Sequence, residues 1–105
     1  MVFFDTNSTA LSQQANTTVT EAAGVAKSTP NSRLVVTGYT DTEGSVAYNK
    51  ALSVRRANAV RDALMRNGIS PAAISVVGEG EQGLLVPTPD QTKNENNRRV
   101  QIVVQ

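Results

Sequence analysis

The chain has 105 residues, with 10 lysine and arginine side chains against 9 aspartates and glutamates, which gives a formal net charge of +1. This length suits one domain with its own core, and the nearly balanced charge excludes the broad basic field of most nucleic-acid-binding proteins. Cysteine and histidine are both absent, so disulfides, thiolate metal sites and the usual general base of enzymes are excluded.

No part of the sequence has the character of a membrane anchor. Its apolar runs fall short of the ~18 consecutive residues of a membrane span, and no basic segment followed by an apolar one marks a signal peptide. Met1 leads directly into the apolar residues Val2 and Phe3. We therefore expect residues 1–105 to be a single domain of a longer protein, attached to a membrane only through a segment outside this sequence.

The first third of the chain predicts a strand and then a helix. Val2 to Asp5 favours a short strand, and a hydroxyl in the polar stretch 6–9 can cap the following helix. Apolar residues recur there at helical spacing, namely Leu11, Ala15, Val19, Ala22 and Ala26. This pattern stops before Pro30, and its small residues indicate close packing on a sheet.

A second strand and a second helix are predicted in the middle of the chain. The strand covers residues 34–39, is apolar on both faces and is therefore central, and it ends at Thr40 and Asp41. The helix extends from about Ser45 to Asn67, and its core-facing residues are Ala57, Val60 and Leu64. Gly68 suits the left-handed position after a helix, and residues 70–71 favour a short helical turn with proline at its first position.

The last third predicts two more strands, at residues 74–78 and 99–104. Between them, residues 79–97 show no period, and such long irregular stretches are often functional. The resulting order β-α-β-α-β-β predicts an α+β two-layer sandwich, with a mixed four-stranded sheet and both helices on one face.

Asp41 is the first candidate site residue, because it follows a central strand at the edge where open sheets place ligand contacts. Aspartate is also a common turn former, and that role alone would explain it.

The pair Arg55 and Arg56 is the second candidate. If Ser53 caps a helix that starts afresh, both arginines lie near a helix N-terminus, where an anion would be favoured. If one helix continues from Ser45, both lie in mid-helix as solvated surface charges. A carboxylate at Asp41 and a guanidinium at Arg56 would together suit a zwitterion, unless these two side chains pair with each other.

Two further charged segments are weaker candidates. Residues 97–99 read Asn-Arg-Arg and form either a clamp at the start of the last strand or, as we favour, a turn with exposed charge. Glu79 and Glu81 resemble paired carboxylates only superficially, because no nucleophile or metal partner accompanies them.

The sequence resembles the C-terminal OmpA-like domain, which also occurs in peptidoglycan-associated lipoprotein and flagellar stator proteins. The residues that carry the resemblance are Phe3 to Asn7, Gly38 to Asp41, Gly44, Tyr48, Asn49, Leu52, Ser53, Arg56, Ala57, Val60, Leu64, Gly68, Ile69, Gly78 to Glu81 and Asn97 to Val100. They cover practically the whole chain, and their order and spacing make the match specific. The family's β-α-β-α-β-β sandwich agrees with the fold predicted from periodicity.

The resemblance implies binding of peptidoglycan without turnover, cofactor or metal. By residue matching, Asp41 would hold the ammonium of diaminopimelate in the stem peptide, and Arg56 would hold its carboxylate. The pocket lining implied by the same match is Asn49, Leu52, Thr42 and Asn7. Tyr39 stands where histidine is more usual and Asn7 where several relatives carry aspartate, so one contact to the ammonium is expected to be weaker.

We therefore expect a non-catalytic module that tethers an outer-membrane or envelope protein to the wall, at the periplasmic face of the outer membrane of a Gram-negative bacterium. Two alternatives stay open. The chain could be an adaptor whose 79–97 loop docks an envelope protein, or a small enzyme acting near Asp41 and Arg56, although the absence of histidine and cysteine weighs against the enzyme.

Overall fold

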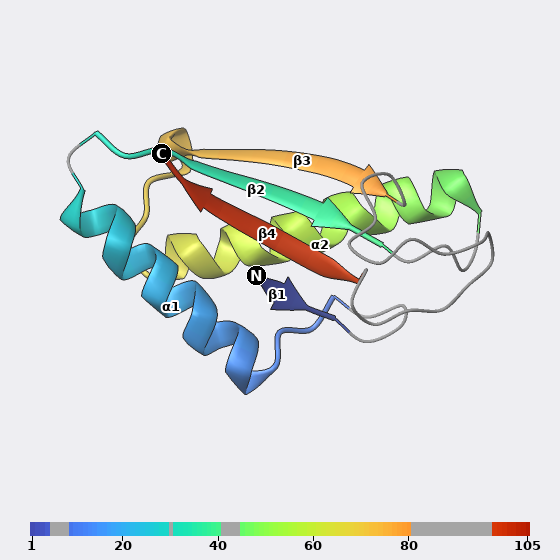
Figure 1. Ribbon diagram of the computed structural model, residues 1–105, viewed down its shortest axis with the longest axis horizontal. Helices are drawn as coiled ribbons and strands as arrows, with labels where there is room; N and C mark the ends of the chain where they lie inside the picture. Colours follow the sequence, from blue (N-terminus) through green and yellow to red (C-terminus); the bar gives the residue numbers. More distant parts are fainter. Residues whose placement is uncertain (5–8, 30, 41–44, 81–97) are drawn as a thin grey trace.

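The computed structural model describes residues 1–4, 9–29, 31–40, 45–80 and 98–105 (Figure 1). Its strands are β1 (Val2–Phe3), β2 (Leu34–Tyr39), β3 (Ile74–Gly80) and β4 (Arg99–Val104). Its helices are α1 (Gln13–Ser28), α2 (Val46–Arg66) and the short 3-10 helix η1 (Pro71–Ala73). Within these described residues, no helix combines the length and the apolar character needed to cross a membrane.

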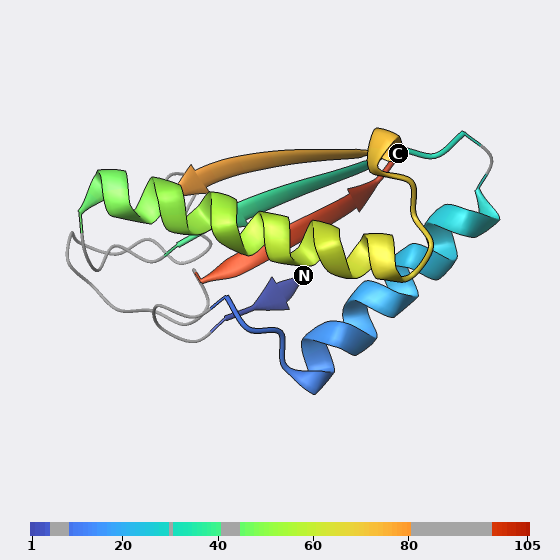
Figure 2. The same cartoon turned by 180° about the vertical axis from the view of Figure 1, so that it is seen from behind.

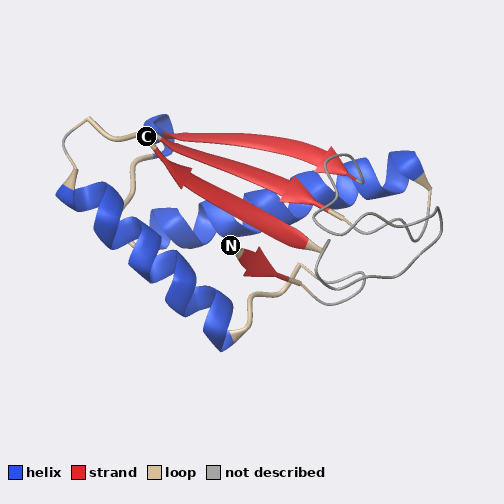
Figure 3. Cartoon of the chain, in the orientation of Figure 1, coloured by secondary structure: helices blue, strands red, loops and turns tan. Residues whose placement is uncertain are grey.

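The strands form one mixed sheet in the order β1-β4-β2-β3 (Figure 3). β2 pairs with β3 in parallel and with β4 antiparallel, so β2 is central as the sequence predicts, and β1 pairs with β4 antiparallel. Both helices lie on the same face, with α2 along β2 and β3 and α1 beside α2 (Figures 1 and 2). The predicted α+β two-layer sandwich is confirmed.

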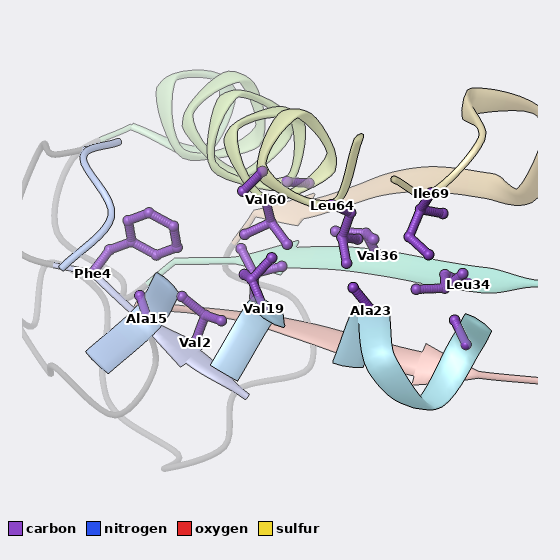
Figure 4. Close-up of a cluster of buried hydrophobic side chains, with 14 residues drawn as sticks. Val2, Phe4, Ala15, Val19, Ala23, Leu34, Val36, Val60, Leu64 and Ile69 are labelled. Carbon is purple, nitrogen blue, oxygen red and sulfur yellow. The ribbon is translucent and has the colours of Figure 1, made fainter. Parts of the chain in front are cut away.

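The core lies between the sheet and the two helices, where apolar side chains from both layers meet (Figure 4). The predicted core residues Ala57, Val60 and Leu64 are all fully buried. On α1 the buried positions are Ala15, Val19, Ala23 and Ala26, so Ala23 is the third buried position, while the predicted Ala22 is partly buried and packs against the same core. The helix phase explains this difference, because the third core position follows Val19 by four residues instead of three.

Helix α1 begins later than its sequence predicts. Ser12 is the N-cap, and its hydroxyl accepts a hydrogen bond from the backbone N–H of Ala15 at 3.0 Å. A cap within residues 6–9 was the expectation, and it is wrong because Ser12 satisfies the first turn itself. Leu11 therefore precedes the helix and packs against the core from the loop.

The segment after α2 follows the prediction closely. Gly68 has φ of 92°, and Ile69 donates a backbone hydrogen bond to Leu64 at 3.1 Å, as in a Schellman motif. Ile69 is 8% exposed and joins the core. η1 begins at Pro71 as expected. β3 is two residues longer than the predicted 74–78, because Glu79 and Gly80 continue the strand.

Two glycines let α2 lie directly on the sheet. A Cβ atom added at Gly38 of β2 would overlap the carbonyl oxygen of Ser53 and lie 2.9 Å from its carbonyl carbon. One added at Gly78 of β3 would overlap the Val54 side chain and lie 2.8 Å from the Ser53 hydroxyl. At Gly38 the obstructing atoms belong to the helix backbone, which cannot move out of the way as a side chain can, so this position above all sets the height of α2 above the sheet.

We predict that Gly38→Ala lowers the free energy of unfolding by about 2 to 3 kcal/mol, because the new methyl group must displace the backbone of α2. Gly24→Ala is the matched control. Apart from the neighbouring backbone of its own helix, no atom of the described residues lies within 4 Å of a Cβ at that position, so the alanine should raise stability by about 0.5 to 1 kcal/mol. Urea denaturation measures both, and equal effects would contradict the close approach of α2.

Candidate binding site

The candidate site lies at the end of the sheet where β2 and β3 finish and β4 begins, beside the N-terminal half of α2 (Figure 1). Thr40 is 1% exposed there and donates its backbone N–H to the carbonyl of Gly80 at 2.7 Å. This bond fixes the point at which the chain leaves β2, directly before the predicted ligand residue Asp41. Asp41, Thr42 and Asn7 themselves lie outside the described residues.

Helix α2 is continuous across the predicted site. Its N-cap is Ser45, whose hydroxyl accepts from the N–H of Tyr48 at 3.0 Å. Ser53 caps nothing. Its hydroxyl donates to the carbonyl of Lys50 at 2.7 Å and accepts from the buried N–H of Gly80 at 2.9 Å. The proposed fresh start at Ser53 is therefore wrong, and with it the idea of an anion held at a helix N-terminus by the two arginines.

Three of the six predicted binding residues lie on one face of α2. Asn49, Leu52 and Arg56 are separated by three and four residues, the spacing of one helical face, and are 1%, 4% and 0% exposed. Arg55 turns away to the exposed side, where its guanidinium carbon lies 5.9 Å from the centre of the Tyr48 ring. The structure thus separates the two neighbouring arginines and keeps only Arg56 with the predicted site.

The burial of Arg56 rules out, for this residue, the alternative of a solvated surface charge. It is the largest of the fully buried side chains in the described part of the chain. Its guanidinium carbon lies 5.3 Å from the centre of the Phe4 ring, within the range of a cation–π interaction. Arginine is among the residues least often buried, because its charge is costly to remove from water. Such a position calls for an explanation beyond packing.

Arg98 and Arg99 are also buried, at 7% and 4% exposed, so the favoured prediction of a turn with exposed charge is wrong. The Arg98 Nε donates to the backbone carbonyl of Phe4 at 2.9 Å. The Arg99 guanidinium carbon lies 3.9 Å from the centre of the Tyr39 ring. Burial lowers the pKa of Arg99 from its usual value, and the nearby Tyr39 partly opposes this shift. Each arginine is thus held by an aromatic residue of a neighbouring strand or its extension.

Sequence reasoning did not connect Phe4 with Arg98, and it assigned Ser53 the role of a helix N-cap instead of a contact to the sheet. The first two contact each other across 94 residues of chain, and no local pattern indicates such a pairing. One sequence signal could have indicated a buried arginine here. When an arginine begins a strand and the neighbouring strand ends in an aromatic residue, the two side chains can stack across the strands. The buried guanidinium groups of Arg56, Arg98 and Arg99 lie near this end of the sheet, and a guanidinium can bind a carboxylate through two parallel hydrogen bonds.

These features define a two-layer α+β domain with buried cationic groups at one end of its sheet. Residues 3–98 match the model of the OmpA family, and the chain belongs to the OmpA family.

Individual relatives agree with this assignment. The chain is 39% identical over 110 residues to an outer membrane protein of Gluconacetobacter diazotrophicus, covering 99% of this chain but only 29% of the relative. It superimposes on the crystal structure of the peptidoglycan-associated lipoprotein from Burkholderia pseudomallei with a TM-score of 0.90 and 33% identity, covering 99% of this chain and 88% of that one. The C-terminal domain of Helicobacter pylori MotB, at a TM-score of 0.86 and 22% identity over 99% of this chain and 81% of that one, shares the fold.

The two adjacent arginines of α2 provide a test of burial. We predict that Arg56→Ala lowers the free energy of unfolding by about 2 to 4 kcal/mol, because it removes a large buried side chain and leaves a cavity. Arg55→Ala, at the exposed neighbouring position, should change it by less than about 0.5 kcal/mol. Arg56→Met retains the aliphatic volume without the charge and should cost less than Arg56→Ala. Thermal and urea unfolding measure all three, and equal losses for the two alanine variants would contradict a buried Arg56.

Proposed function

We propose that this domain binds peptidoglycan without covalent attachment or turnover, by holding the diaminopimelate of a stem peptide, and so tethers an outer-membrane or envelope protein to the cell wall. The observation that carries the proposal is the fully buried guanidinium of Arg56, placed beside Asn49 and Leu52 on one face of α2 in an OmpA-family domain. The expected location is the periplasmic face of the outer membrane.

The names of two similar proteins support the proposal. One, at 33% identity, is a peptidoglycan-associated lipoprotein, and another is an outer membrane protein. The chain spans 29% of the outer membrane protein's length, so the tethering of a whole envelope protein to the wall is itself part of the proposal. Envelope proteins are the further partners that this proposal includes.

The proposed mechanism is recognition of a zwitterion by two opposite charges. The side-chain end of diaminopimelate carries an ammonium and a carboxylate on the same carbon. Asp41 accepts hydrogen bonds from the ammonium, and Arg56 donates to the carboxylate through its planar guanidinium. Asn49 supplies a neutral amide beside Arg56. Leu52 covers the aliphatic part of the ligand, while Thr42 and Asn7 complete the pocket.

Binding by this mechanism requires the site to open. Asn49 and Arg56 are at most 1% exposed, so a ligand reaches them only when the atoms that cover them move aside. The observed affinity is then the intrinsic affinity multiplied by the fraction of molecules that are open. One small ligand also offers few atoms for contact, so each domain should bind modestly, and many anchored copies on one wall would act together.

We predict that the purified domain co-sediments with insoluble peptidoglycan of the meso-diaminopimelate type and much less with the lysine type. Lysine keeps the terminal ammonium but lacks the adjacent carboxylate, so it removes only the group assigned to Arg56. The bound fraction is measured by quantifying protein in the pellet at rising wall concentration. Equal sedimentation with both wall types would show that the ligand assignment is wrong.

A second prediction separates a ligand-holding carboxylate at position 41 from a turn former. Asp41→Asn preserves the shape of the side chain and its ability to support a turn, yet removes the charge that the ammonium needs. We expect affinity for a diaminopimelate-containing muropeptide to fall about 10- to 100-fold, with little change in stability.

Calorimetry at two ionic strengths checks this expectation. The difference between wild type and Asp41→Asn should shrink as the Debye length falls from ~10 Å at 0.1 M salt to ~3 Å at 1 M. Indistinguishable isotherms for the two proteins would remove Asp41 from the site.

A further inference from the structure

Phe4 is a buried aromatic residue at the end of the core nearest the candidate site (Figure 4). It follows β1 directly and is 4% exposed. Its ring lies 5.3 Å from the guanidinium carbon of Arg56, although the two residues belong to different layers of the sandwich. A core phenylalanine would normally be surrounded by apolar groups, and here one neighbour is a cation.

Arg98 bonds both backbone polar groups of Phe4. The N–H of Phe4 donates to the carbonyl of Arg98 at 2.8 Å, which extends the pairing of β1 with β4 by one residue. The Nε of Arg98 then donates to the carbonyl of Phe4 at 2.9 Å, and this bond is buried. The position of the ring therefore depends on the side chain of Arg98 as well as on the sheet.

We propose that Phe4 and Arg98 are positioning residues for the ligand-binding Arg56. The Phe4 ring packs against the guanidinium, and Arg98 fixes that ring to the start of β4. This inference rests on the proposed function and adds two residues that do not touch the ligand themselves.

The choice of an aromatic ring has a physical consequence. A ring attracts a cation through its quadrupole and offers no conventional hydrogen-bond acceptor. Contact with Phe4 therefore positions the Arg56 guanidinium without using any of its N–H donors. A long arginine side chain also loses much rotamer freedom when it is fixed. Because the fold has already fixed Arg56 against the ring, ligand binding costs less side-chain conformational entropy.

Phe4→Leu tests the inference, since leucine preserves apolar volume and removes the ring face. Phe4→Tyr restores the ring and should behave as wild type. Phe3→Leu is the matched control, because Phe3 is 48% exposed and adjacent in sequence, and its β1 neighbour Val2 is the one that faces the core. Arg98→Lys retains the positive charge without the Nε donor and tests the fixing of the ring through a second residue.

The ligands are two muropeptides that differ only in the side-chain carboxylate of diaminopimelate, free in one and amidated in the other. We expect Phe4→Leu and Arg98→Lys to weaken binding of the free-carboxylate form about 3- to 10-fold, the range that a cation–π contact supports. Binding of the amidated form should change by less than twofold. When Arg56→Met is already present, adding Phe4→Leu should not change binding further. If Phe4 were merely structural, Phe4→Leu would weaken the binding of both muropeptides, with or without Arg56→Met.

A spectroscopic readout requires no ligand. In NMR spectra the Arg56 side-chain protons should carry a ring-current shift that is lost in Phe4→Leu and retained in Phe4→Tyr. If wild type prefers the free-carboxylate muropeptide yet Phe4→Leu and Arg98→Lys bind it as wild type does, the positioning role is overturned and the proposed function stands. If wild type binds neither muropeptide, or both equally, the proposed function fails and takes the positioning role with it.

Discussion

The fold depends on the contact between the backbone of α2 and the backbones of β2 and β3. At Gly38 and Gly78 the helix lies so close that even a methyl group would collide with it. Ser53 uses this proximity by accepting a hydrogen bond from Gly80, so the helix and the sheet are bonded as well as packed. The inner face of α2 consequently has little free space, and its polar residues Asn49 and Arg56 are held at a defined depth.

Most of the fold could be predicted because its periods are local. Residues 34–39 and 99–104 were predicted as strands and are β2 and β4, and α2 begins within one residue of the predicted Ser45. The errors fall where two local signals compete. Several hydroxyls precede α1, and only the structure shows that Ser12 is the cap. The third core position of α1 shifted by one residue because small residues stand on both sides of it, so the apolar stripe had no sharp edge.

The candidate site was predictable in its α2 part and less so elsewhere. The spacing of Asn49, Leu52 and Arg56 places them on one helical face, and the structure shows that face buried. The burial of Arg56 was not predictable, because nothing in the local sequence shows that Phe4 lies beside it. Arg98 was likewise misjudged, since its partner lies 94 residues away. Charge patterns indicate a solvated surface by default, and only tertiary contacts correct them.

The pairing of the first strand with the last has a kinetic consequence. Val2 lies opposite Val100, so this pairing closes a loop of nearly the whole chain. The parallel pairing of β2 with β3, joined through α2, closes a much shorter loop and opposes folding less through chain entropy. Contacts between distant residues form slowly. We therefore expect β2, α2 and β3 to assemble first and the contact of Phe4 with Arg98 to form late, so that the surroundings of Arg56 are completed only at the end of folding.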